Sequence, residues 1–321
     1  MGDMSDVIVV GSLNTDLVVR TPRFPEPGET ISGEDLQVIP GGKGANQAVA
    51  VARHGAQVSM LGRVGDDSFG DFLLDNLKEN NVDFHHVQRD SSSTGTAMII
   101  VDTNGQNSII LSAGANGNVS AADVNTASFP DFKLLLLQLE IPIPTVLAAA
   151  QLAHDSGCRV ILNSAPAREL PEELLRLVDF LILNEVELSL LTGINVHDNT
   201  SAEEAAKSLT GRGVKTVIVT LGSHGALIVS AEQVTHVDSY NVQVVDTTAA
   251  GDAFIGGFAY SLLQNKALEA AVRYACACGA LATTKFGAQP SLPTKEEVEL
   301  FVAEQVGREA SPTGDNSSHG S

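Results

Sequence analysis

The chain contains 321 residues, of which 43% are hydrophobic and 18% are charged, a composition that predicts a globular protein with a large core. Its formal net charge is −20, it has no Trp, and only 4% of its residues are aromatic. Such an acidic surface repels phosphate backbones and anionic lipids, so we expect neither a nucleic-acid partner nor a membrane.

The cysteines and the N-terminal segment indicate the compartment. Cys158, Cys276 and Cys278 have no spacing typical of a disulfide framework, and the last two lie in an apolar helical run. The N-terminal residues lack the basic segment of a signal peptide, and no apolar run reaches the roughly 20 residues of a membrane span. We therefore expect a cytoplasmic protein.

Strand and helix patterns alternate along most of the chain. Short apolar runs predict strands at residues 7–10, 58–61, 134–139, 159–162, 180–183 and 217–220. Helical composition predicts helices at residues 43–54, 68–80, 144–156, 252–264 and 268–285. Ser68 is the expected N-cap of the second helix. The alternation predicts one α/β domain over residues 1–308, with a mainly parallel central sheet flanked by helices. The polar residues 309–321 predict a disordered tail.

Two segments, at about 17–40 and 95–114, interrupt this alternation. The first carries prolines between alternating apolar residues, and the second contains two apolar runs joined at Asn104-Gly105, a strong hairpin signal. We expect both to form a small inserted sheet whose apolar face needs a partner. The sheet could cover a ligand as a lid, pack on a second subunit, or do both; alternatively, its strands extend the main sheet.

Two polar segments accompany the first strand and the first helix. Asn14 and Asp16 follow the strand in the sequence GSLNTD, and an amide beside a carboxylate suits vicinal hydroxyl groups. The sequence GGKGAN opens the helix, where Lys43 adds a positive charge and Asn46 lies about one turn further on. It matches neither the GxxxxGK[ST] nor the GxGxxG phosphate-binding loop. An ordinary turn and a plain glycine-rich helix start are the alternatives.

The sequence DTTAAGD, residues 246–252, runs into a long apolar helix and carries the sharpest signal. The free N–H groups of the first helical turn would form an anion hole. Asp252 lies in that turn, where a carboxylate is stabilised and could accept a proton from a hydroxyl nucleophile. Positioning and charge stabilisation are what phosphoryl transfer chiefly needs. The alternative is a helix-capping aspartate.

Two further loops follow predicted strands. Asn184 and Glu187 are three residues apart, on one helical face, and could orient Mg²⁺-bound water and phosphates or form a capping box. The sequence TLGSHG, residues 220–225, could lie along a nucleotide or close an ordinary hairpin.

Together these segments resemble the ribokinase family of sugar kinases, in matching order over nearly the whole chain to about Phe301. The matching segments are GSLNTD, FPEPGET, GGKGANQAVA, NSAPA, NEVE, TLGSHG, DTTAAGDAF and GAQPS. The resemblance implies a Rossmann-like ribokinase fold, inserted strands that form a lid and a homodimer interface, and phosphorylation of D-ribose at O5 by ATP.

The resemblance also implies roles for individual residues. The sugar would be held by Asn14, Asp16, Gly42, Lys43, Asn46 and Glu140. Asp252 would be the general base, beside an anion hole formed by Ala249, Ala250 and Gly251. The ATP-binding residues would be Asn184, Glu187, Thr220, Gly222, Ser223, Gly225, Gly251 and Cys276.

The resemblance further implies two kinds of metal ion. Asn184 and Glu187 would organise Mg²⁺ largely through water. An activating monovalent cation, usually K⁺, would be bound by Asp246, Thr248, Ala282, Gly287 and Ser291. Two positions depart from the family, because Ala253 stands where Thr or Ser is frequent and Cys276 stands where adenine-contacting residues vary.

Three alternatives stay open. The acceptor could be deoxyribose, fructose or a nucleoside, because the pocket depends on lid side chains such as Ala97 and Ile110. The chain could be a sugar sensor without activity, although a complete DTTAAGD segment favours an enzyme. A dinucleotide-dependent dehydrogenase is disfavoured, because the GxGxxG loop is missing.

Overall fold

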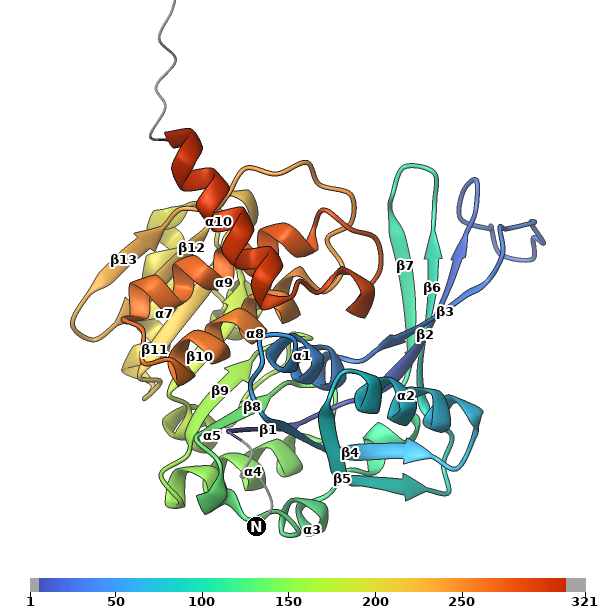
Figure 1. Cartoon of the computed structure of the whole chain (residues 1–321), viewed down its shortest axis with the longest axis horizontal. Helices are drawn as coiled ribbons and strands as arrows, with labels where there is room; N and C mark the ends of the chain where they lie inside the picture. The colour runs from blue at the N-terminus through green and yellow to red at the C-terminus, as the bar shows by residue number, and fades with distance from the viewer. Residues whose placement is uncertain (1–5, 310–321) are drawn as a thin grey trace, which may run out of the picture.

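The computed structural model describes residues 6–309, which are built around a nine-stranded sheet (Figure 1). The strand order is β13-β12-β11-β10-β9-β8-β1-β4-β5, parallel from β11 to β5 and antiparallel at β12 and β13. The strands are β1 (Val7–Val10), β4 (Val58–Gly65), β5 (Val82–Asp90), β8 (Leu134–Leu137), β9 (Arg159–Asn163), β10 (Phe180–Asn184), β11 (Thr216–Thr220), β12 (Ala226–Ser230) and β13 (Val234–Val237).

Helices cover both faces of this sheet, so its central strands are apolar on both sides and alternate residues enter two separate cores. One face packs against α1 (Lys43–Ala52), α2 (Ser68–Glu79), α8 (Ala250–Leu263), α9 (Leu268–Ala282) and α10 (Lys295–Glu309). The other packs against α3 (Ala121–Val124), α4 (Ile143–Asp155), α5 (Glu172–Leu177), α6 (Glu185–Thr192) and α7 (Asn199–Gly211). The predicted α/β fold with a mainly parallel sheet is confirmed.

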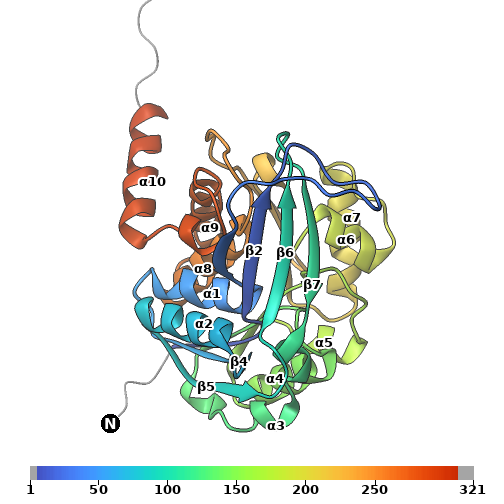
Figure 2. The same ribbon diagram turned by 90° about the vertical axis from the view of Figure 1, so that its right-hand side faces the viewer.

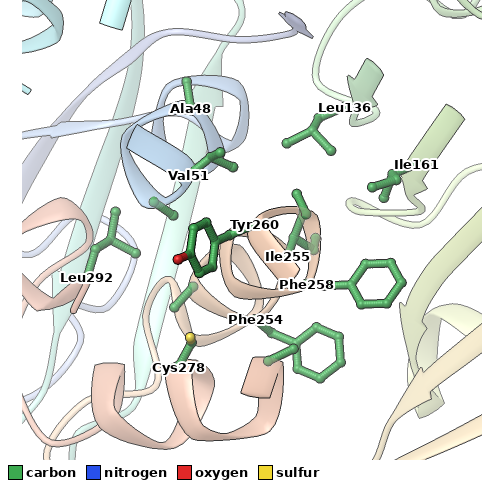
Figure 3. Close-up of a cluster of buried hydrophobic side chains, with 14 of the residues drawn as sticks. Ala48, Val51, Leu136, Ile161, Phe254, Ile255, Phe258, Tyr260, Cys278 and Leu292 are labelled. Carbon is green, nitrogen blue, oxygen red and sulfur yellow. The ribbon is translucent and has the colours of Figure 1, made fainter. Parts of the chain in front are cut away.

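Helix α8 is fixed by unusually close packing on α1. A Cβ atom at Gly256 would lie 2.4 Å from the Cβ of Ala50, so the two helices approach closely only because residue 256 is glycine. On another side of the helix, Ile255 and Phe258 belong to the buried cluster that includes Leu136 of the sheet (Figure 3). The start of α8 is therefore held between α1 and the sheet.

A second sheet stands at one side of the main domain (Figure 2) and confirms the expected inserted strands. Its order is β3-β2-β6-β7, with β2 (Asn14–Arg20), β3 (Gln37–Gly41), β6 (Gly95–Val101) and β7 (Asn107–Ser112). We call this four-stranded sheet the lid. The guanidinium carbon of Arg20 lies 4.4 Å from the centre of the Phe286 ring, a cation–π contact that joins the lid to the main domain.

Several predicted boundaries need correction. The N-cap of α2 is Asp67 rather than Ser68, because the Asp67 carboxylate accepts a hydrogen bond from Gly70 N at 2.9 Å. Helix α8 begins at residue 250, two residues before its predicted start, and α9 ends at residue 282 rather than 285. Strands β5 and β13 were not predicted, because their polar residues hide the strand pattern at the sheet edges. Of the predicted tail, Glu309 ends α10 and the remainder lies outside the described residues.

Among residues 6–309, none of the helices combines the length and the apolar character needed to span a bilayer.

Candidate active site

A cavity of about 350 Å³ lies where the carboxyl ends of β9, β10 and β11 meet the start of α8. Ligands of open α/β sheets bind at this edge. The predicted site residues that line the cavity are Lys43, Asn184, Glu187, Thr220, Thr248, Ala249, Gly251 and Asp252. From the lid, Asn107 and Ile109 line it too. Ile110, which we expected at the pocket, is 65% exposed, because strand alternation directs it to the opposite face of the lid.

Asp252 is the third residue of α8 and only 5% exposed. Its two carboxylate oxygens are both hydrogen-bonded: Asn46 Nδ2 donates to Oδ2 at 2.9 Å and Gln47 Nε2 donates to Oδ1 at 3.0 Å. Burial raises the pKa of Asp252, whereas the Lys43 ammonium and these two amides act to lower it. The side chain is therefore a buried carboxylate whose ionised form is supported from α1.

The start of α8 presents N–H groups beside this carboxylate. Ala249 precedes the helix with a left-handed φ of 59°, which is strained for a residue that has a side chain. Of the predicted anion-hole groups, the N–H of Ala250 donates to Thr247 O at 3.2 Å, whereas in the described chain the N–H groups of Ala249, Gly251 and Asp252 have no protein acceptor. The donors available to an anion are therefore those of residues 249, 251 and 252.

Five charged side chains meet around this point. Burial raises the pKa of Asp16 to about 7, and the nearby carboxylates of Glu140 and Asp252 add to the effect. Burial alone would lower the pKa of Lys43, but Asp252, Glu140, Glu187 and Asp16 together outweigh it, so that the pKa is raised. Lys43 is therefore a firmly protonated cation among carboxylates.

The residues predicted to hold a sugar are tied to the base of the lid. Asn14 Oδ1 accepts a hydrogen bond from Asn116 Nδ2 at 2.7 Å, which leaves the amide N–H groups of Asn14 as donors. Glu140 Oε2 accepts from Ser12 Oγ at 2.5 Å and from Lys43 N at 3.0 Å. Asn14 and Asp16 lie on β2, so the first lid strand begins three residues before the predicted start of that segment at about residue 17.

Two glycines make room for these side chains. A Cβ atom at Gly41 would lie 2.2 Å from Asp16 Oδ2, and one at Gly42, whose φ is 86°, would lie 2.6 Å from Asn14 N. Asp16 lines a neighbouring cavity of about 900 Å³ beneath the lid. Asn46 Oδ1 is buried and has no partner in the described chain, so this oxygen is unsatisfied next to Asp252.

A third space, of about 550 Å³, adjoins the first cavity and shares Asn184, Thr220, Thr247 and Gly251 with it. The other predicted ATP residues that line it are Gly222, Ser223, Gly225 and Cys276. The 220–225 turn joins β11 to antiparallel β12, so it is a hairpin and also lines this cleft. The sequence had not indicated Tyr240, which lies on the same wall.

Asn184 and Glu187 form a capping box at the start of α6, with Asn184 Oδ1 accepting from Glu187 N at 2.8 Å. Glu187 Oε2 accepts from Asn184 N at 2.9 Å, while its other oxygen has no protein partner among the described residues. Burial raises the pKa of Glu187. Over residues 6–309 no cluster of three His, Cys, Asp or Glu side chains could hold a metal ion alone.

Hydrogen bonds bring together only part of the predicted monovalent-cation site. The Asp246 carboxylate accepts hydrogen bonds from Thr248 Oγ1 at 2.7 Å and from Gly287 N at 2.9 Å. Ala282 ends α9, and the adjacent carbonyl of Thr283 accepts from Asp246 N at 3.1 Å. Ser291 is buried, its hydroxyl donates to Ala288 O at 2.8 Å, and no hydrogen bond of the described chain joins it to Asp246.

The sequence interpretation missed Gln47, Gln138 and Asn163, which connect Asp252 to the sheet. A signal for each was available. Gln47 stands four residues after Lys43 and so shares its helical face. Gln138 follows β8 and Asn163 ends β9, at the sheet edge where ligands bind.

The chain matches the family described as pfkB family carbohydrate kinase over residues 4–295. It is 42% identical over 297 residues to a ribokinase of Haemophilus influenzae, which covers 92% of this chain and 97% of that protein. It is 39% identical over 303 residues to a deoxyribokinase of Salmonella typhi, which covers 93% of this chain and 99% of that protein.

The fold is similar to that of an Arabidopsis thaliana ribokinase solved in complex with ribose and ATP. The two align with a TM-score of 0.87 and 34% identity, over 94% of this chain and 99% of the other. The chain therefore belongs to the pfkB family of carbohydrate kinases.

Proposed function

We propose that this carbohydrate kinase phosphorylates D-ribose at O5 with ATP and releases ribose 5-phosphate and ADP. The observation that supports this most is the position of Asp252, a buried carboxylate beside free helical N–H groups. It lies on the cavity that adjoins both the space under the lid and the cleft at the 220–225 turn. Transfer to a hydroxyl requires a base and an anion-stabilising group at one point.

In the proposed reaction, Asp252 takes the proton from O5 as this oxygen bonds to the γ-phosphorus. The bond between that phosphorus and the β–γ bridging oxygen breaks, and its electrons leave with ADP. The N–H groups of Ala249, Gly251 and Asp252 stabilise the charge of the transferred group, as the electropositive end of a helix does. Lys43 adds the positive side chain nearest to the base.

The sugar is bound by groups that suit neighbouring hydroxyls. Asn14 donates through its amide, and the carboxylates of Asp16 and Glu140 accept from hydroxyl groups. Lys43 donates, Asn46 accepts through its unsatisfied Oδ1, and Gly42 lets the ligand approach the backbone.

ATP is bound in the cleft lined by the 220–225 turn, and Mg²⁺, when bound with it, neutralises phosphate charge. Glu187 would hold this ion through water with its free carboxylate oxygen, beside Asn184. That arrangement fits a chain without a dedicated metal cluster over residues 6–309. A monovalent cation such as K⁺ would be held by Asp246 and backbone carbonyls near Thr248, Ala282, Gly287 and Ser291, where it would steady the anion hole.

An ADP-release assay with Mg-ATP and a panel of sugars tests the proposed function. We expect ribose-dependent turnover that rises when K⁺ is added, and slower turnover with fructose or a nucleoside. The relation to a deoxyribokinase makes deoxyribose the main competitor in the panel. Faster turnover with deoxyribose than with ribose would show that deoxyribose is the preferred acceptor. No turnover with any acceptor would refute the proposal.

Removing the base should remove most of the activity. We expect Asp252→Asn to lower kcat by about 10²-fold or more, the usual contribution of general-base catalysis. Asp238→Asn is the matched control, because its carboxylate is exposed and it should keep wild-type turnover. A normal kcat in Asp252→Asn would exclude this residue as the base.

The raised pKa of Asp16 should make stability depend on pH. Its pKa rises from 3.8 to about 7 on folding, so the folded protein binds the proton more tightly than the unfolded chain does. Wild-type stability therefore falls as the pH rises from about 4 to about 7, by up to roughly 1.4 kcal/mol per pH unit from this group.

Asp16→Asn should avoid the loss of folding stability at higher pH, because an asparagine side chain does not ionise. We expect its melting temperature, measured without ligands, to exceed that of the wild type at pH 8, with a smaller difference at pH 5. The same variant should bind ribose more weakly. If the wild type is as stable as the variant at pH 8, folding does not raise the pKa of Asp16.

We propose that two copies associate through the outer face of the lid. Strand pairing places Val38, Leu17, Met98 and Ile110 in one row across this face. Three of them are unusually exposed for large apolar residues: Val38 at 45%, Met98 at 53% and Ile110 at 65%. An apolar row of this kind across a small sheet indicates an interaction surface.

Charges on that row should separate the copies. We expect the wild type to be a dimer by light scattering and the Met98→Glu/Ile110→Glu variant to be a monomer. Leu300→Glu is the control, because Leu300 is 64% exposed on α10 and distant in sequence from the lid. A monomeric wild type, or a dimer in the double variant, would refute the lid interface.

A further inference from the structure

We infer that Gln47 is a positioning residue for the reaction, because its side-chain amide holds the Asp252 carboxylate at the start of α8. The inference rests on the proposed role of Asp252 as the base. Because Gln47 lines none of the spaces proposed for sugar and nucleotide, contacts with the substrates would not identify this residue.

The Gln47 amide is fully buried, with 0% exposure, and each of its polar atoms is hydrogen-bonded. Its Nε2 atom donates to Asp252 Oδ1 at 3.0 Å and to Asn163 Oδ1 at 3.1 Å. Its Oε1 atom accepts from Gln138 Nε2 at 2.5 Å. Both N–H groups and the oxygen are therefore engaged by three different elements.

The neighbours of this amide allow it only one orientation. Asn163 Nδ2 donates to Ile182 O at 3.2 Å, so Asn163 turns its oxygen toward Gln47 and requires a donor there. Gln138 donates to Gln47 through Nε2, but its own Oε1 is buried without a partner in the described chain, so Gln138 follows the orientation of Gln47 and does not fix it. If the Gln47 amide were reversed, its oxygen would face the oxygens of both Asn163 and Asp252, which is repulsive. Asn163, anchored on β10, thus fixes the Gln47 amide so that its second N–H group points at Asp252.

This chain of amides links the base to the sheet. Asn163 ends β9, Ile182 lies in β10, and Gln138 follows β8, so three adjacent parallel strands determine the position of Gln47. Asn46, on the same helix α1, holds the other oxygen of Asp252 at 2.9 Å. Both carboxylate oxygens are fixed in this way, which defines the direction from which Asp252 can receive a proton.

The hydrogen bond also favours the form of Asp252 that acts as a base. A donated N–H stabilises a carboxylate more than a carboxylic acid, and burial opposes it. The charged groups that face Asp252 are Lys43 from α1, Asp16 from the lid, Glu140 after β8, and Glu187 from α6. Lys43 is the one cation among these groups, so loss of an amide donor should raise the pKa of Asp252.

Gln47 does not line the cavity at Asp252, the cleft at the 220–225 turn or the space under the lid. A substitution there should therefore change kcat and leave the binding of both substrates nearly intact. This separates it from Asn14, Asp16 and Lys43, whose proposed contacts are with the sugar.

The test is the pH dependence of turnover in Gln47→Leu, which removes the amide and keeps a similar volume. We expect kcat at pH 7 to fall by about 10- to 100-fold, as for the loss of a hydrogen bond to a charged group, with KM for ribose and ATP within about threefold. The acidic limb of kcat/KM should move to higher pH, so the defect should shrink as the pH rises. In an Asp252→Asn background, Gln47→Leu should cause no further loss.

Thr145→Val is the matched control, because the buried Thr145 hydroxyl donates to Val119 O at 2.7 Å on the opposite side of the sheet. It should lose stability and keep the wild-type pH profile. If Gln47→Leu does not fold, Gln47→Met decides, since it keeps an unbranched side chain of similar length, also lacks the amide donor and should shift the acidic limb in the same direction. Unchanged kcat and pH profile in a folded variant would overturn the inference. A wild type inactive on every sugar would instead refute the proposed function.

Discussion

A buried carboxylate at the start of a helix is the constraint on which this site depends. An ionised side chain that is 5% exposed is costly unless charges and hydrogen bonds replace the water it has lost. At Asp252 the replacement comes from Lys43 and from the two amides of Asn46 and Gln47, all on α1. These groups reach the carboxylate because Gly256 allows α1 and α8 to touch. A packing contact well inside the core therefore supports the ionised form of the Asp252 carboxylate.

The charges near this carboxylate raise the question of how an acidic protein would bind a polyanion. Lys43 faces four carboxylates, and the whole chain carries a formal charge of −20, so side-chain charge alone would repel ATP. Under the proposed function, attraction must come from oriented N–H groups at residues 249, 251 and 252 and from cations that arrive with the nucleotide or bind beside it. The start of α8 could attract phosphate because its partial positive charge comes from peptide dipoles. It therefore adds no cationic side chain that would pair with the Asp252 carboxylate.

The sequence was enough to predict those features that depend on local pattern. Apolar runs separated by helical segments predict the parallel sheet, and Asn104-Gly105 predicts the lid hairpin, because each signal lies within a few residues. The network around Asp252 could not be predicted in this way. Gln47 and Asp252 are 205 positions apart, and Gln47 and Gln138 are 91 apart, so their contacts exist only after the sheet and helices have packed. For the lid, both faces are apolar, and alternation alone could not tell whether Ile109 or Ile110 faces the ligand.

That ambiguity follows from what a four-stranded lid must do. A sheet of this size is marginal by itself, so it needs apolar contacts on more than one side. Alternation divides the same strands between two partners: Val18, Ile99 and Ile109 face the space beside the site, and Leu17, Met98 and Ile110 face outward. A one-residue slip in register would exchange these sets and expose the wrong face to the sugar. If the outward row is covered by a second copy, the partner holds the register of the strands that shape the sugar pocket, and association and substrate selection become properties of one sheet.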